Sequence, residues 1–286
     1  MLLRTVKSSI SVSRQTFFCF KNYCSATSGL TQVSNKDGIR SIILNDEKTK
    51  NSLSLQMMDT LIENIQHDRH NEALRCIVIS SKGNVFSAGH NLKELTKENG
   101  SENHKLIFSR CSELMLAIMN SPVPIIAKVD GLATAAGCQL VATCDIAICS
   151  DRSKFSTPGA NFGIFCSTPG IAVARVVPRM QASYMLLTGL PISASDAKVS
   201  GLVSDVVPQA ELDERVNVVC NAIKSKSRAV LDLGKKFFYA QLTMDVKTAY
   251  DLGGQVMVSN LKMKDGIEGI KSFVEKRKPE WSHKNE

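Results

Sequence analysis

The chain has 286 residues, of which 43% are hydrophobic and 22% are charged, so its composition favours a globular protein with one large domain or two small ones. No apolar stretch reaches the length of a membrane span, and the nine cysteines include no Cys-x-x-Cys pair and no zinc-ligand spacing. We therefore expect no membrane span, no metal site, and cysteines that are reduced and buried.

The basic charge is concentrated at the N-terminus. The formal net charge is +8, with 35 basic and 27 acidic residues, and residues 1–36 contain five of the basic residues and no acidic one. This serine-rich segment also places Leu2, Val6 and Ile10 at helical spacing, a pattern typical of a mitochondrial presequence. We expect residues 1–36 to be a transit peptide and residues 37–286 to be the folded domain of a mitochondrial matrix protein. A disordered basic tail on a cytosolic protein is the alternative.

The charge does not indicate a nucleic-acid partner. Outside residues 1–36 the balance is 30 basic against 27 acidic residues, and one Trp and four Tyr are few for base stacking. No recognised RNA-binding motif is present, so a nucleic-acid partner is not expected.

Strand and helix patterns alternate through the first half of the chain. The β-branched run Ile39–Leu44 predicts a strand, and apolar residues at helical spacing from Leu55 to Ile65 follow Ser54, a suitable N-cap. Further strands are predicted at Cys76–Ile79, Ile125–Val129 and Ile146–Cys149, and further helices at Leu106–Ile118 and Cys138–Thr143. This order predicts an α/β fold with parallel neighbouring strands.

After about residue 169 the pattern is mostly helical, with one later strand at Val203–Val207. The predicted helices are Pro169–Val177, Arg179–Leu187, Ala194–Ser200, Glu211–Lys226, Ala229–Gln241 and a last one near Gly266–Lys276. We therefore expect a strand-rich core over about residues 37–200 and a helical C-terminal part over about residues 201–286.

Two stretches of small residues, about fifty residues apart, carry the strongest functional signal. Ser87-Ala88-Gly89 follows a predicted strand, and Ala135-Ala136-Gly137 precedes a predicted helix. Small residues let a backbone approach a ligand closely, and a helix that begins there presents free N–H groups and the positive end of its dipole. Each stretch alone is more often simple close packing. Together they predict paired N–H donors for the oxyanion that develops in thioester chemistry.

The order and the flanking residues of these stretches resemble the crotonase (enoyl-CoA hydratase/isomerase) superfamily. The residues that match its signatures are Phe86–Leu95, Pro124–Leu140, Cys144-Asp145-Ile146, Phe155, Pro158 and the closing helix Glu268–Lys278. The resemblance spans approximately Gly38 to Lys278. It implies an α/β fold in which a spiral core of ββα turns is capped by a helical C-terminal region.

The resemblance also implies the site residues. The backbone N–H groups of His90 and Ala136 would form an oxyanion hole. Within one chain, the CoA path would be lined by Ala88, Asn91, Leu92 and Lys93, with Lys93 near the phosphates. Phe273 and Lys276 of a neighbouring subunit would also reach the CoA. The implied ligand is an acyl-CoA of fatty-acid or acyl-CoA metabolism, with no further cofactor, and the implied assembly is a homotrimer or a hexamer.

The chain departs from the family's pattern at both glutamates that hydration uses. The first aligns with Gln139, which forms hydrogen bonds but takes up no proton at useful pH, and the second aligns with Gly159, which has no side chain. General acid–base groups are worth about 10²–10⁴-fold each, so we expect very low hydratase activity. Asn91 stands where an aspartate is common, and we assign that change no role.

Other polar residues are candidates for recruitment to the acyl pocket: Ser156, Thr157, Asn161, Cys166 and Ser167. Cys166 has no identified base, so a buried structural thiol is favoured over a nucleophile. His90 is expected to act through its backbone, although its imidazole is also a candidate. His67 and His70 are expected to be solvated residues.

Three hypotheses follow. The first is an acyl-CoA-binding enzyme without the hydratase carboxylates, for which decarboxylation of a malonyl-type thioester makes the smallest demands on the site. The second is a non-catalytic acyl-CoA-binding or scaffolding protein. The third is a weak enoyl-CoA hydratase.

Overall fold

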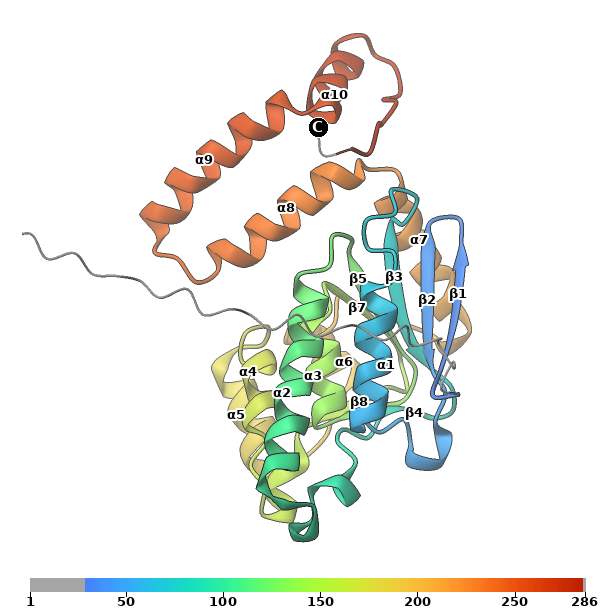
Figure 1. Ribbon diagram of the computed structural model, residues 1–286, viewed down its shortest axis with the longest axis vertical. Coiled ribbons are helices and arrows are strands. Elements are labelled where there is room, and N and C mark those ends of the chain that lie inside the picture. The colour runs from blue at the N-terminus through green and yellow to red at the C-terminus, as the bar shows by residue number, and fades with distance from the viewer. Residues whose placement is uncertain (1–28, 285–286) are drawn as a thin grey trace, which may run out of the picture.

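The computed structural model describes residues 29–284, which form two sheets enclosed by helices (Figure 1). The larger sheet contains, in spatial order, β1 (Thr31–Lys36), β2 (Ile39–Leu44), β3 (Cys76–Ser81), β5 (Ile125–Val129), β7 (Ile146–Ser150) and β10 (Asp205–Val207). The smaller sheet contains β4 (Val85–Ser87), β6 (Leu132–Thr134), β8 (Lys154–Ser156) and β9 (Ile192–Ser193).

Four ββα turns follow one another along the chain. Their helices are α1 (Leu55–Gln66), α2 (Gly100–Met119), α3 (Ala136–Thr143) and α4 (Ser167–Val173), each preceded by two strands. From turn to turn the strands pair in parallel in both sheets. The predicted α/β fold with a ββα spiral core is confirmed.

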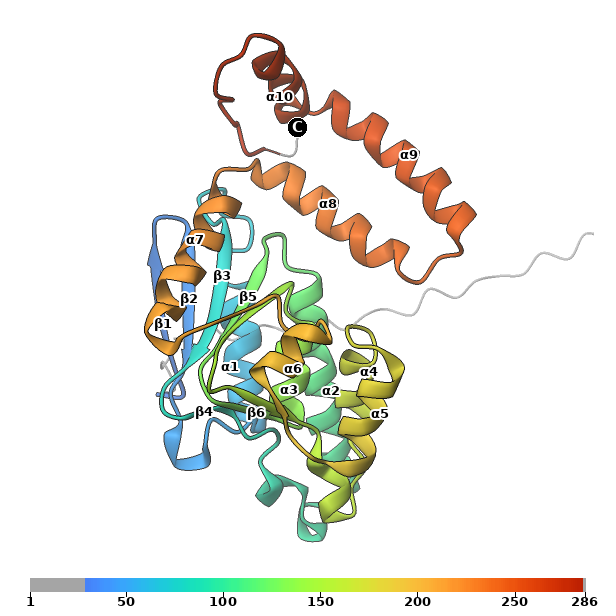
Figure 2. The same cartoon turned by 180° about the vertical axis from the view of Figure 1, so that it is seen from behind.

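The alternation of side chains in the strands explains their continuous apolar runs. In β3, Ile77 and Ile79 belong to the main core, whereas Cys76 and Val78 belong to a second cluster with α7 (Leu212–Lys224). Successive strand residues point to opposite faces, so a sheet covered on both faces needs apolar residues at every position. Figure 2 shows α7 lying across the back of the larger sheet.

The folded domain begins earlier than the sequence pattern predicts. β1 pairs antiparallel with β2 through the turn Asp37-Gly38, whose φ angles of 50° and 79° are the left-handed values of a tight Asp-Gly hairpin. The predicted boundary at Lys36 is therefore corrected, because Thr31–Lys36 is a strand of the domain. The rest of the predicted transit peptide, residues 1–28, lies outside the described residues.

The C-terminal part is helical, as predicted, but the helix Val246–Lys262 was not predicted, and the ends of the other helices differ by a few residues. The remaining helices are α5 (Arg179–Thr188), α6 (Ala194–Val199), α8 (Arg228–Gln241), α9 (Val246–Lys262) and α10 (Lys264–Val274). Short 3₁₀ helices are η1 (Glu47–Thr49), η2 (Leu92–Leu95), η3 (Lys97–Asn99), η4 (Pro158–Phe162) and η5 (Gln209–Glu211). The predicted late strand is β10, which pairs with β7 and extends the larger sheet beyond residue 200.

The helices α8, α9 and α10 form an arm that projects from the body, and the segment after α10 returns to the start of α8 (Figures 1 and 2). Trp281 Nε1 donates to the Ser225 carbonyl at 2.9 Å, and Asp265 accepts the N–H groups of Ser282 and His283 at 2.7 and 2.9 Å. These bonds hold the segment after α10 against the start of α10 and against Ser225, which lies just before α8. No helix within residues 29–284 is long and apolar enough to cross a membrane.

A buried ion pair joins the arm to the body. Lys235 Nζ on α8 lies 2.6 Å from Asp145 Oδ2, and the two side chains are only 8% and 15% exposed. Asp145 also accepts the Tyr239 hydroxyl at 2.8 Å and the Ile125 N–H at 2.7 Å. Burial lowers the pKa of Lys235, and the carboxylate of Asp145 opposes that shift.

We expect Asp145→Asn to lower the free energy of unfolding by about 3–5 kcal/mol, because it removes the carboxylate that pairs directly with the buried ammonium of Lys235. Equilibrium unfolding in urea measures the change. Lys247→Gln is the matched control, since it breaks an exposed pair with Asp251 on α9. Equal urea midpoints for the two variants would show that the buried pair does not hold the arm.

Candidate functional site

The two small-residue stretches, far apart in sequence, meet in the structure. A Cβ placed on Gly89 would lie 3.1 Å from the Ala136 backbone nitrogen and 2.9 Å from the Ala135 Cβ. A Cβ on Gly137 would lie 2.4 Å from the Ser87 carbonyl oxygen. Glycine at both positions is therefore what lets the end of β4 pack directly against the start of α3. We call this contact the Gly89–Ala136 junction.

Backbone hydrogen bonds hold the junction in place. The Leu53 N–H donates to the Gly89 carbonyl at 2.7 Å, and the Ala135 N–H donates to the Ser156 carbonyl at 2.9 Å. Gly89 has φ +86°, and Ala135 has φ +52°, which is an uncommon conformation for a residue with a Cβ. Such strain persists where the surroundings enforce it, and it often accompanies functional sites.

Two backbone N–H groups at the junction have no partner within the part of the chain that the structure describes. Ala136 is the first residue of α3, and no side chain caps this helix, so its N–H lacks an intrahelical acceptor. The His90 N–H donates to no acceptor within residues 29–284. The start of α3 also carries the positive end of the helix dipole. The junction therefore suits an oxygen atom that carries or develops negative charge.

The imidazole of His90 is partly buried beside this backbone. Its Nδ1 lies 3.3 Å from the Leu53 carbonyl oxygen, and its ring meets Phe108 edge to face at 5.4 Å. Burial lowers the pKa of His90, with a smaller opposing effect from the Leu53 carbonyl. Its Nε2 is buried without a hydrogen-bond partner in the described part of the chain.

Gln139 lies on α3, one turn from the junction, and is 5% exposed. Its Oε1 is 3.9 Å from the Cys111 thiol, which is a weak contact. Burial raises the pKa of Cys111 to about 12, so the thiol stays protonated. This part of the site therefore holds two neutral groups and no general base.

Backbone closes around Gly159, the residue that the sequence resemblance aligns with the second glutamate of hydration. A Cβ on Gly159 would lie 2.2 Å from the Ile164 carbonyl oxygen and 2.7 Å from the Cys166 sulfur. The Gly159 N–H donates to that sulfur at 3.2 Å. The segment from Gly159 to Cys166 is thus folded onto the place where a glutamate side chain would begin. A glutamate side chain at Gly159 would therefore require this segment to move.

The contacts of the other candidate residues near this segment give none of them an activated nucleophile or a base. Burial raises the pKa of Cys166, with a smaller opposing effect from the Gly159 N–H, so the thiol is not activated as a nucleophile. Ser156 Oγ donates to Thr134 Oγ1 at 2.9 Å. Thr157 Oγ1 is buried and has no partner in the described residues. Asn161 packs against Gly189.

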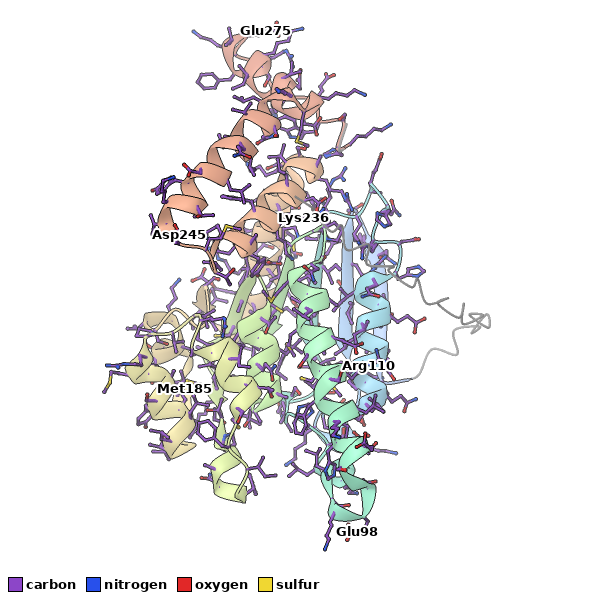
Figure 3. All side chains as sticks on the ribbon, turned by 60° about the vertical axis from the view of Figure 1, so that its left-hand side comes forward. Glu98, Arg110, Met185, Lys236, Asp245 and Glu275 are labelled. Carbon is purple, nitrogen blue, oxygen red and sulfur yellow. The ribbon has the colours of Figure 1, made fainter. Side chains whose placement is uncertain are left out.

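The candidate CoA-binding residues fall into two separate groups. Ala88 and Asn91–Lys93 lie beside the junction in sequence; Asn91 accepts the Lys93 N–H at 3.2 Å, and Leu92 and Lys93 are exposed. Phe273, 83% exposed, and Lys276 lie at the end of the arm. Figure 3 places Glu98 and Glu275 at opposite ends of the molecule, so one chain does not bring the two groups together.

Two clefts lie elsewhere on the described part of the chain. A cleft of 340 Å³ lies between α1 and α2, where Ile65 and Leu116 line it, and a cleft of 290 Å³ lies beside the β1–β2 turn. Neither includes a predicted site residue. Within residues 29–284, no cluster of three or more His, Cys, Asp or Glu residues could hold a metal ion.

The fold and the junction define the class of protein. The sequence profile of the enoyl-CoA hydratase/isomerase family matches residues 34–284, and the chain belongs to this family. The resemblance drawn from the two signatures is thereby confirmed.

Individual proteins of known sequence are also similar to this chain. The chain is 54% identical over 253 residues to human "Enoyl-CoA hydratase domain-containing protein 3, mitochondrial", covering 88% of this chain and 84% of the relative. A probable enoyl-CoA hydratase of Bacillus subtilis is 30% identical, with 81% of this chain and 90% of the relative covered.

Solved structures agree with these relatives. The crystal structure of the human protein has a TM-score of 0.87 at 54% identity and covers 88% of this chain and 100% of its own. An enoyl-CoA hydratase of Mycobacterium smegmatis has a TM-score of 0.86 at 41% identity, covering 88% and 98%.

Proposed function

We propose that this protein binds acyl-CoA thioesters, with the N–H groups of His90 and Ala136 donating to the thioester carbonyl oxygen. The observation that carries the proposal is the Gly89–Ala136 junction, where two unpaired backbone N–H groups meet at a helix N-terminus. Such preorganised donors stabilise an oxyanion strongly in a site that excludes water.

The rest of the ligand follows the residues beside the junction. Ala88 and Asn91–Lys93 line the CoA path, and the exposed ammonium of Lys93 meets the nucleotide phosphates. The thioester itself supplies the reactive group, and no further cofactor takes part. The relatives named as mitochondrial support a mitochondrial location, which we extend to the matrix and to fatty-acid or acyl-CoA metabolism.

The favoured reaction is decarboxylation of a malonyl-type acyl-CoA. Gln139 and the closed position at Gly159 supply neither base nor acid for hydration. Loss of CO₂ breaks the bond between the α-carbon and the carboxylate and leaves its electron pair on the thioester as an enolate. The hole stabilises that enolate, and one proton then forms the new bond to the α-carbon.

A non-catalytic acyl-CoA-binding or scaffolding role is the second candidate. The observation that favours it is the closure of the backbone around Gly159, which removes a catalytic position without replacing it. Weak enoyl-CoA hydration ranks third, because it needs a base and an acid that the described site lacks.

One experiment separates the three candidates. The purified protein is titrated calorimetrically with saturated, enoyl and malonyl-type CoA thioesters, and mass spectrometry follows the products. Binding with conversion of malonyl-CoA to acetyl-CoA supports decarboxylation, binding without any product supports the non-catalytic role, and hydrated product supports the hydratase. Absence of binding to every thioester would contradict the proposal as a whole.

We also propose that the protein assembles as a homotrimer or a hexamer through the arm. Helix α9 buries no residue within its own chain, yet it exposes large apolar side chains: Tyr250, Met257, Val258 and Leu261. An apolar helix face without a partner in its own chain marks a protein interface. In such an assembly Phe273 and Lys276 would reach the CoA of a neighbouring subunit.

The double variant Met257→Glu with Leu261→Glu is expected to dissociate the assembly to monomers and to weaken CoA binding, because it places charge in the contact. Light scattering after size exclusion measures the mass. Gln255→Glu, an exposed polar site on α9, is the control and should keep the wild-type mass. An unchanged mass in the double variant would show that α9 is not the interface.

A further inference from the structure

The proposed hole uses only the backbone of His90 and leaves its imidazole without a role. A carbonyl oxygen only accepts hydrogen bonds, so the contact between Nδ1 and the Leu53 carbonyl at 3.3 Å places the proton on Nδ1. Nε2 then carries a free lone pair. It is buried and has no partner in the described part of the chain. Buried polar atoms are nearly always paired, so an unpaired one beside a candidate site points to a ligand group.

Two other unpaired polar atoms belong to residues that adjoin the same junction. One is Oγ of Ser52, the residue before Leu53. The Leu53 N–H donates a hydrogen bond to the Gly89 carbonyl. Thr157 is fully buried and its Oγ1 is unpaired in the described residues. It follows Ser156, whose carbonyl accepts the Ala135 N–H. The elements that fix the junction thus also carry unpaired hydroxyl groups, which suits an acyl group with a polar substituent better than a plain alkyl chain.

Phe108 of α2 covers the imidazole. The two rings are 5.4 Å apart and nearly perpendicular, at 84°. Phe108 is 36% exposed, so the ring that packs against the imidazole lies at the protein surface. Leu53 and Phe108, which both contact the imidazole, carry no charge.

We propose that Nε2 of His90 binds the carboxylate of a malonyl-type acyl group and later protonates the α-carbon. This inference rests on the proposed decarboxylation. The imidazole takes one proton from solvent as the acyl carboxylate binds. The bond from the α-carbon to the carboxylate then breaks, CO₂ leaves, and the electron pair becomes the enolate held by the hole. The Nε2 proton forms the new α-carbon–hydrogen bond, and the imidazole returns to its neutral form.

The electrostatics of His90 suit this cycle. In the free protein, burial lowers its pKa and the Leu53 carbonyl raises it to a smaller extent, so the imidazole is neutral at pH 7. A carboxylate against Nε2 favours the charged form. Proton uptake should therefore accompany binding of a malonyl-type thioester and not of a saturated one.

Rapid mixing of the protein with malonyl-CoA in a weakly buffered indicator solution at pH 7.5 tests this. We expect uptake of about one proton per site before CO₂ appears, and no uptake with acetyl-CoA. His90→Asn keeps a donor toward Leu53 but lacks Nε2. It should lose the early uptake and slow decarboxylation by about 10²–10⁴-fold. Binding of acetyl-CoA by the same variant is measured in parallel, and a loss of rate that exceeds any loss of binding supports the proposed role.

Two controls keep the outcome interpretable. His90→Gln provides a second replacement in case His90→Asn does not fold. His104→Asn changes a histidine on α2 whose Nε2 lies 3.0 Å from the Thr96 carbonyl oxygen, and it should leave the uptake unchanged. If the wild type decarboxylates malonyl-CoA and the His90 variants keep the rate and the uptake, His90 is not the proton carrier although the proposed reaction holds. If the wild type neither binds nor converts malonyl-CoA, the proposed reaction is wrong and the role of His90 falls with it.

Discussion

Gly89→Ala is expected to abolish the contribution of the acyl group to ligand affinity and to slow turnover by about 10²–10³-fold. A Cβ at this position would lie 2.9 Å from the Ala135 Cβ, 3.0 Å from the Thr134 carbonyl and 3.1 Å from the Ala136 nitrogen. Every one of these contacts is on the facing wall of the junction. The substitution therefore separates the two N–H groups that the proposed hole needs to keep together.

The measurement is the ratio of the dissociation constants for an acyl-CoA and for free CoA. In the wild type the acyl thioester adds affinity, whereas in Gly89→Ala the two ligands should bind equally. Gly100→Ala is the matched control, since Gly100 also has a positive φ, +74°, but has nothing within 4 Å of an added Cβ. It carries the backbone strain of alanine at such an angle without the steric contact. If both variants lost the same part of the affinity for the acyl group, backbone strain alone would explain the result.

Gly159→Glu is expected to give no hydratase activity, alone or together with Gln139→Glu. The Ile164 carbonyl oxygen would lie 2.2 Å from the new Cβ, so the segment from Gly159 to Cys166 has to move before any side chain fits. Overpacking of this kind typically lowers stability by about 1–3 kcal/mol. Gln139→Glu alone should fold, because it changes one atom of a buried side chain, although it buries a charge.

Crotonyl-CoA hydration and thermal unfolding together test this expectation. Gly163→Glu is the control within the same segment, since its φ of +75° imposes strain but an added Cβ meets nothing within 4 Å. It should unfold at a higher temperature than Gly159→Glu. Strong hydration by the double variant would contradict the account, because it would show that two missing side chains are the whole difference from a hydratase.

Much of the fold could be predicted from local patterns. Ser54 caps α1, accepting the Met57 N–H at 3.2 Å, as the sequence predicts. The central strands β3, β5 and β7 are buried on both faces, so they can be recognised in the sequence as short apolar runs. The strands of the smaller sheet have two or three residues each and show no periodicity. Asp37-Gly38 was a hairpin signal that would have placed the first strand correctly.

Helix α9 was missed for a different physical reason. A helix is recognised in sequence by an apolar face that packs on its own chain, and α9 buries nothing there. Its apolar residues therefore show no simple relation to the core of this chain.

The sequence predicts which two backbone stretches form the candidate site, but it does not predict the side-chain contacts around them. The two small-residue stretches, which the sequence predicts to form one site, meet in the structure at Gly89 and Ala136. The use of the His90 and Ala136 N–H groups as an oxyanion hole stays a prediction. The closure of the backbone over Gly159 could not be read from the sequence, since it depends on the path of Ile164 and Cys166. The unpaired Nε2 of His90 likewise depends on contacts with Leu53 and Phe108, which are distant in sequence.

The central claim is that the N–H groups of His90 and Ala136 bind a thioester carbonyl. Infrared difference spectroscopy of the protein with a saturated acyl-CoA, labelled with ¹³C at the carbonyl, tests it directly. Two hydrogen bonds polarise the carbonyl, so its stretching band should move to lower frequency on binding, and it should stay at the solution frequency with Gly89→Ala. A bound ligand whose band is unshifted in the wild-type protein would contradict the claim.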